Sequence, residues 1–295
     1  MGQMIPKSGL KVQRPDVDET STKAIQDELT RLIEEPWMAQ ADMNERIFAA
    51  ERRVNAPLAQ LMENDADVVA ASQEIGRLRR KARIQQSDGA EAADTHAFDS
   101  LMRDALKGVK HGINVFVPPY DWVIDVEHTA GEAVEDKAAG TFAASIEGYF
   151  GSGSSWATAG VGVALKATVD GVANIRPPMY DNWNWFIDAN LFSANTSGSC
   201  RVVVQDPVSG AVLGPDGDRS IPLWNHTSQT GASNHGAGSF FATDIAPTVT
   251  LSAGQIFNVS FLANVFTNQS GSLAFGHSYA DCRLEVSLPL FVVQM

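Results

Sequence analysis

The sequence predicts an α+β fold divided by segment, with an N-terminal α-helical, coiled-coil part at residues 18–112 and an all-β antiparallel sandwich of the jelly-roll kind at residues 113–295. Three observations predict this division. Apolar residues recur at helical spacing before residue 112, whereas alternating and β-branched runs separated by Gly, Pro, Asn and Asp follow it. Charged side chains also thin out after that point, where Lys137 and Lys166 are the only lysines.

Residues 1–17 are expected to form an extended arm. They contain Pro6, Gly9 and Pro15 and show no apolar periodicity, so the arm is disordered or is ordered by lying on other subunits of a particle. The first residues lack the apolar core of a secretory signal, and the sequence therefore predicts no export by that route.

Two helices are expected between the arm and residue 57. Good N-cap residues cluster at 18–21, and Ile25, Leu29, Leu32 and Ile33 then form one apolar stripe. Pro36 is predicted to end this first helix. A second helix follows over residues 37–56, and Pro57 kinks or breaks it. One side of that helix carries an apolar set: Met43, Ile47, Ala50 and Val54.

A third helix, over residues 58–86, is the predicted oligomerisation element. Its apolar residues repeat every seven positions and extend over roughly three heptads, which is typical of a short coiled coil. The repeating and complementary positions are Leu61, Val68, Ala71, Ile75 and Leu78. The chain is therefore expected to form a homo-oligomer, a trimer or higher. A last helix is predicted over residues 91–110.

The β-domain is predicted from short runs of strand-forming residues bounded by turn signals. The expected strands are 113–117, 122–128, 141–150, 157–169, 183–192, 200–205, 240–244, 248–251, 255–266 and 283–293. The stretch Gly148–Leu165 is almost free of charge and rich in small residues. A central strand pair with a loop, a subunit contact and a membrane-inserting hairpin all fit this composition.

No catalytic motif occurs in the sequence, and no enzyme activity, cofactor or metal is predicted. The histidines of the β-domain lack metal-like spacing. His226 and His235 fall in a predicted loop, 224–238, where polar contacts are favoured over a metal site. Asp216 and Asp218 are interpreted as part of a hairpin turn, with a Ca²⁺ loop as the alternative. Two buried thiols are favoured over a disulfide for the two cysteines, Cys200 and Cys282.

A cluster of aromatic and polar residues is the candidate ligand site. Tyr180, Asp181, Trp183 and Trp185 lie close together, and the two tryptophans share a face of a strand. Aromatic rings beside carboxylate and amide groups suit a sugar, whose faces are apolar and whose edges carry hydroxyls. The alternative is that both tryptophans fill the sandwich core.

The formal net charge of −13 argues against nucleic acid as a partner, and no apolar run is long enough for a transmembrane helix. An arm, a helical stalk and a Lys-poor head favour a non-enzymatic structural or attachment subunit of a virion, of the phage fibre, spike or decoration type. The expected location is a virion or extracellular particle, or alternatively the cytoplasm. A module that binds cell-surface glycans and a β-pore-forming toxin are the two alternative functions.

Overall fold

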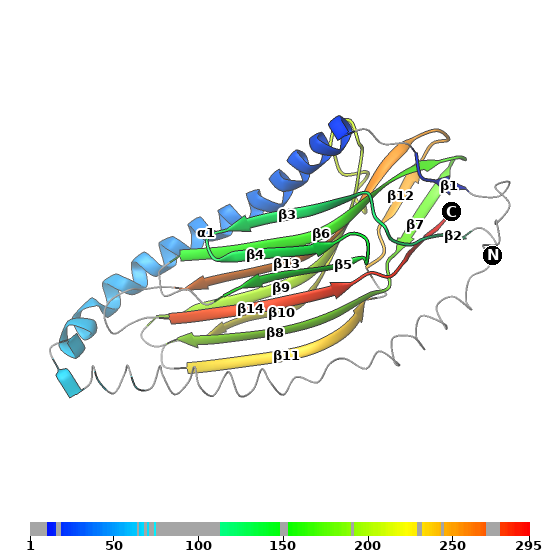
Figure 1. Ribbon diagram of the computed structural model, residues 1–295. Helices are drawn as coiled ribbons and strands as arrows, with labels where there is room; N and C mark the ends of the chain where they lie inside the picture. The colour runs from blue at the N-terminus through cyan, green and yellow to red at the C-terminus, as the bar shows by residue number, and fades with distance from the viewer. Residues whose placement is uncertain are drawn as a thin grey trace.

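The computed structural model describes residues 11–15, 19–63, 65–67, 70, 74, 113–147, 153–189, 192–228, 232–242, 245–269 and 278–295. These residues form mostly antiparallel β-sheets, against which one long N-terminal helix lies (Figure 1). The β-sandwich expected for residues 113–295 is therefore confirmed in its coarse form. None of the described helical segments is both long and apolar enough to cross a lipid bilayer.

Two sheets make the sandwich. The back sheet has the strand order β1-β6-β13-β9-β10, and β3 adds to β6. The front sheet has the order β11-β8-β14-β5-β4. The back strands are β1 (Val12–Gln13), β3 (Trp122–His128), β6 (Gly153–Ala167), β9 (Ala194–Gln205), β10 (Asp218–Ser228) and β13 (Ile256–Gln269). The front strands are β4 (Gly131–Asp136), β5 (Thr141–Ile146), β8 (Met179–Ala189), β11 (Ala232–Ala242) and β14 (Ser278–Ser287).

A smaller end sheet closes one end of the sandwich, with the order β12-β7-β15-β2. Its strands are β2 (Ile113–Phe116), β7 (Gly171–Arg176), β12 (Thr248–Leu251) and β15 (Phe291–Gln294). The single strand expected over residues 283–293 is therefore wrong, because the chain leaves the front sheet around Pro289 and enters the end sheet as β15. Proline has no backbone donor for a ladder, which accounts for the break.

The prediction of a loop at residues 224–238 is also wrong. Residues 224–228 belong to β10 and residues 232–238 belong to β11, and these are the edge strands of the two sheets. Their Ser, Asn and Gly content resembles a loop because edge strands are only partly buried, and a register shift at Pro222 interrupts the β10–β9 ladder. Strands β4 and β7 were likewise not expected from the sequence.

The glycine- and alanine-rich stretch is largely strand β6, which lies inside the back sheet. It pairs with β13 along its whole length on one side and with β1 and β3 on the other. Val161, Val163 and Leu165 are fully buried in the core between the sheets. Of the three interpretations of this stretch, the central strand is the one that this placement supports.

Helix α1 (Glu19–Glu63) runs without interruption through Pro36 and Pro57, so the expected end at Pro36 is wrong. A proline inside a helix costs about 3 kcal/mol, since it removes one hydrogen bond and crowds the preceding turn. Packing outweighs this cost, because residues on both sides of Pro36 are anchored in the same surface. Leu29 and Ile33 before it and Phe48 after it are all buried.

The helix covers the outer face of the back sheet. Leu29 and Ile33 form a cluster with Ala164, Val203 and Leu262, which project outward from the sheet. Trp37 stacks on Phe266 with ring centroids 5.0 Å apart. Each fully buried Leu or Ile side chain contributes about 1.5–3 kcal/mol relative to exposure. The helical segment is therefore part of the head's second, smaller core.

The described part of the arm also lies on the head. Val12 and Gln13 pair with Ala167 and Lys166 of β6, and the Lys11 ammonium donates a hydrogen bond to the carbonyl of Met295. Of the predicted oligomerisation residues, Val68, Ala71, Ile75 and Leu78 and the side chain of Leu61 lie outside the described residues. The coiled coil therefore remains a prediction.

Tryptophans pack over glycines on neighbouring strands at several places in the sandwich. Trp122 of β3 lies opposite Gly162 of β6, and a Cβ atom added at Gly162 would overlap the indole ring. Trp224 covers Gly198 in the same way. A flat indole can lie directly on the backbone only where the facing residue has no side chain, so these glycines are required by packing.

We expect Gly162→Ala to lower the free energy of unfolding by about 1–3 kcal/mol, because the added methyl group displaces the Trp122 ring. Urea denaturation followed by tryptophan fluorescence measures the loss. Gly171→Ala is the control, since a Cβ there meets only the flexible end of Met295, at 3.3 Å. Equal losses in the two variants would contradict the packing explanation.

Candidate binding groove on the front sheet

The outer face of the front sheet carries the candidate site. Along β5 and residues 283–287 of β14 the inward residues, such as Phe142, Leu284 and Val286, are buried, whereas the outward residues alternate with them and are exposed or half-buried. Among the described residues no helix covers this face, in contrast to the back sheet.

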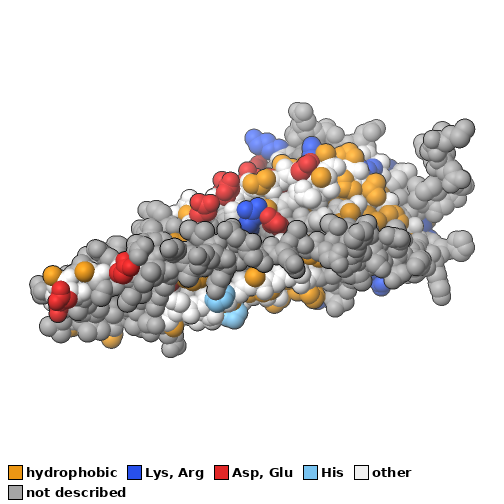
Figure 2. Space-filling view, turned by 60° about the horizontal axis from the view of Figure 1, so that its bottom comes forward, with side chains coloured by type: hydrophobic (Ala, Val, Ile, Leu, Met, Phe, Trp, Pro, Cys, Tyr) orange, Lys and Arg blue, Asp and Glu red, His pale blue; other side chains and the backbone are white. Residues whose placement is uncertain are grey.

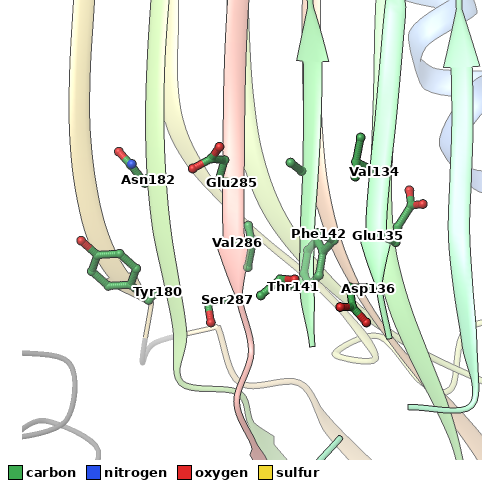
Figure 3. A pocket seen from close by; sticks show the side chains of 11 residues that line it. Val134, Glu135, Asp136, Thr141, Phe142, Tyr180, Asn182, Glu285, Val286 and Ser287 are labelled. Atoms are coloured by element: carbon green, nitrogen blue, oxygen red, sulfur yellow. The ribbon is translucent and has the colours of Figure 1, made fainter. Parts of the chain in front are cut away.

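A groove of about 520 Å³ crosses four strands of this face. Figure 3 shows its side chains rising from β8, β14, β5 and β4. Strand register places them in rows, because Asn182 lies opposite Glu285 and Tyr180 lies opposite Ser287. The outward residues that line it are Val134, Asp136, Thr141, Ala143, Tyr180, Asn182, Glu285 and Ser287.

The chemistry of the groove is that of a hydroxyl-binding surface. Tyr180 offers a ring face and a phenol, Asn182 offers both a donor and an acceptor, and Glu285 and Asp136 offer carboxylate acceptors. Val134, 58% exposed, adds an apolar patch. Among the described residues that line the groove there is no Lys or Arg, and Arg283 beside it is paired with Glu285, so a neutral polyhydroxylated ligand fits the groove better than an anion does.

Acidic groups at the β4 side of the sandwich influence one another. Glu135, which also borders the groove, has its pKa raised to about 7 by partial burial, with a further contribution from the negative charges of Asp125 and Glu127. The pKa of Asp125 is likewise raised, by burial first and by Glu127 second. At neutral pH this edge of the groove therefore carries less negative charge than its carboxyl groups imply.

Of the four residues in the predicted sugar site, the structure places one on this outer face. Tyr180 lines the groove, whereas Asp181, Trp183 and Trp185 point to the other side of β8, between the sheets. Trp183 stacks on Trp224 at 5.4 Å, and Trp185 stacks on His226 at 4.3 Å. This placement matches the alternative in which the tryptophans belong to the core, and it moves the candidate site to the opposite face.

The other residues that line the groove have no signal in the sequence. Asp136, Thr141, Glu285 and Ser287 are far from Tyr180 along the chain, and the pairing of β8, β14, β5 and β4 brings them together. Asn182 is the exception, because it lies two residues from Tyr180 and alternation places both on one face.

The described residues hold no group of His, Cys, Asp and Glu that would bind a metal ion. The carboxylates near the predicted turn are engaged by arginines, since Asp216 pairs with Arg219 and Asp218 pairs with Arg201. Cys200 and Cys282 are free buried thiols. These observations agree with the turn and thiol interpretations.

Asp181 is a buried acid in the interlayer core. Burial raises its pKa to about 7, and the nearby Cys200 thiol offsets a smaller part of that rise. Burial in turn raises the pKa of Cys200, with a smaller contribution from the Asp181 carboxylate. A carboxyl group whose pKa is raised in the folded state disfavours folding when it is ionised. The Asp181 carboxyl therefore lowers the free energy of unfolding most above pH 7.

No family model matches the sequence, and no curated protein sequence matches it. Three solved structures illustrate the similarity found. TmCBM61 in complex with β-1,4-galactotriose is 10% identical over 60% of this chain and 90% of its own, with a TM-score of 0.23. A loop-swap mutant of Necallimastix patriciarum Xyn11A is 13% identical over 64% and 98%, with a TM-score of 0.27. The infectious bursal disease virus VP2 subviral particle is 11% identical over 59% and 37%, with a TM-score of 0.24. At such TM-scores these likenesses carry no argument about function, which therefore rests on the groove itself.

We expect Asp181→Asn to stabilise the protein by up to about 4 kcal/mol at pH 8.5 but by no more than about 2 kcal/mol at pH 5, because the buried carboxyl is neutral at pH 5 and only the ionisation of the unfolded chain is removed there. Chemical denaturation at the two pH values measures the difference. Asp42→Asn on the exposed surface of α1 is the control and should show no such dependence on pH. A gain of equal size at both pH values would argue against a buried charge at Asp181.

Proposed function

We propose that this chain is a non-enzymatic attachment subunit whose β-sandwich head binds carbohydrate at the groove of the front sheet. The observation that carries the proposal is the difference between the two outer faces of the sandwich. The back sheet is covered by the chain's own helix, which packs Leu29, Ile33 and Trp37 against it, while the front sheet presents an open groove lined by both polar and apolar side chains. The head thus has an anchored side and a binding side.

A sugar is the ligand class that the groove supports best. Stacking of a pyranose on the ring of Tyr180 would bury apolar C–H groups, and Asn182, Glu285 and Asp136 would accept or donate hydrogen bonds at the hydroxyls. The floor is made of small side chains such as Ala143 and Ser287, which leaves room for a ring. No nucleophile and base are paired there, which supports binding without catalysis.

Two features, the arm and the surface of the head, support the proposal that this chain is a subunit of a larger particle. The described part of the arm, which begins at Lys11, is held on the head, and residues 1–17 are proposed to contact other subunits. On the face seen in Figure 2, acidic side chains are scattered along the length, and hydrophobic ones gather over the broad end. We therefore propose a virion or similar particle, as in fibre, spike or decoration proteins. An isolated carbohydrate-binding module is the second candidate, and the same groove favours it.

The third candidate, a β-pore former, receives no support from the placement of β6. A pore-forming hairpin must leave its sheet, but β6 is paired on both sides and its inward side chains fill the core. Its release would expose Val161, Val163 and Leu165, which are fully buried.

On a glycan array we expect the protein to bind a subset of neutral oligosaccharides, and we expect Tyr180→Ala to weaken that binding at least tenfold, because stacking on the ring is lost. Titration calorimetry with the best oligosaccharide gives the magnitude. Phe186→Ala is the matched control, since Phe186 projects from the same face of β8 but lies outside the groove. No binding on a broad array, or equal effects of the two variants, would reject the sugar site.

A further inference from the structure

A row of exposed apolar side chains runs along helix α1. Met43, Ile47 and Val54 are 57%, 47% and 77% exposed, and Ala50 between them is exposed as well. Their spacings of four, three and four residues place all of them on one flank of the helix. We call these residues the α1 seam. Large apolar side chains exposed in a continuous row are typical of a surface that another chain covers.

The α1 seam is distinct from the part of the helix that holds the sheet. The sheet-facing residues are Leu29, Ile33, Trp37 and Phe48, and the structure already buries or stacks them. At 100° per residue, the seam residues lie on a different side of the helix axis from these sheet-facing residues. It therefore has no role in fastening α1 to the head.

A groove continues the seam toward the N-terminus of the helix. Pro36 and Gln40 precede Met43 and Ile47 by seven residues, so they lie on the same flank, and they line a groove of about 440 Å³ between α1 and the back sheet. Its floor includes Ser199, Arg201, Asp218 and Ser220 of β9 and β10. Arg201 and Asp218 form an ion pair with each other, so the floor can be covered without leaving an unpaired charge.

The sequence extends the seam in the same register. Ile47 and Val54 are followed at steps of seven by Leu61, Val68 and Ile75. Five successive positions of one heptad site are thus branched aliphatic residues. A repeat of seven is the pattern that keeps an apolar row facing a second helix along its whole length.

The charges beside the seam favour one orientation of the partner. Arg46 and Arg53 flank it on one side, and Glu51 flanks it on the other. In a parallel pair Arg46 of one helix lies near Glu51 of the second, whereas an antiparallel pair would set the arginine flanks against each other. The carboxylate of Glu51 also accepts hydrogen bonds from Ser193, which fixes its position beside the sheet.

We infer that the α1 seam is the interface with a second copy of this chain, whose α1 lies parallel and in register with the first. The inference deepens the proposed function, because two heads joined along α1 would present two sugar grooves at once. The sequence-based expectation of a trimer is replaced here by a pair.

Analytical ultracentrifugation of the full chain should show a dimer at micromolar concentration. The double variant Ile47→Asp, Val54→Asp should raise the dissociation constant about a hundredfold or more, because two carboxylates would be buried at each contact. Met38→Asp is the matched control. Met38 is 59% exposed on the same helix but lies on the opposite flank, and its variant should remain a dimer. Circular dichroism checks that each variant is folded.

Orientation is tested by cysteine cross-linking of single variants. In a parallel pair in register, Ile47→Cys and Val54→Cys should each form a disulfide between the two copies, whereas an antiparallel pair allows at most one of them to do so. Met38→Cys should not cross-link. The native thiols, Cys200 and Cys282, are buried and do not compete.

A folded monomer at all accessible concentrations would overturn the inference. That result would include the case in which another part of the same chain covers the seam. Cross-linking at only one of the two positions would overturn the parallel register. Neither result bears on the sugar groove, which the array and the Tyr180→Ala variant test separately. A monomer that still binds an oligosaccharide would reject the pair and keep the attachment proposal.

Discussion

The packing of helix α1 on the back sheet is the interaction on which the rest of the architecture depends. Leu29, Ile33 and Trp37 bury the outward side chains of β6, β9 and β13, so these strands are enclosed on both faces. That enclosure explains why β6 and β13 contain long buried runs without charge. It also makes the two outer faces of the sandwich different, since the helix covers the back sheet and the candidate groove lies on the front sheet.

The sequence predicted the features that depend on local periodicity. The change near residue 112 and most central strands follow from alternation and β-branched residues, and the stripe at Leu29 and Ile33 follows from helical spacing. The predicted helix end at Pro36 failed because the sheet holds the helix on both sides of the proline, which no local rule detects. Edge strand β10 was not predicted for a related reason. A strand at the edge of a sheet is only partly buried, so its composition resembles that of a loop.

The candidate site shows the same limit. Alternation along β8 places Tyr180 on the face opposite to Trp183 and Trp185, although the sequence analysis grouped all three in one site. The glycines opposite those tryptophans, Gly238 and Gly236, are in β11 and became neighbours only through strand pairing. Glu285 and Thr141 reach the groove from other strands in the same way. A site assembled from four separated segments leaves no motif to find.

The short ladder between β1 and β6 has a mechanical consequence for an anchored head. In the described part of the arm the ladder with β6 comprises Val12 and Gln13, whereas β6 and β13 pair along nearly their full length. Tension entering through the arm would therefore load the weakest pairing first, and the arm would peel from the head before any long strand yielded. The described arm and the last strand also meet at one end of the molecule, where Lys11 binds the carbonyl of Met295. A force applied at either of these two segments would therefore act first on a few hydrogen bonds that lie far from the core between the sheets.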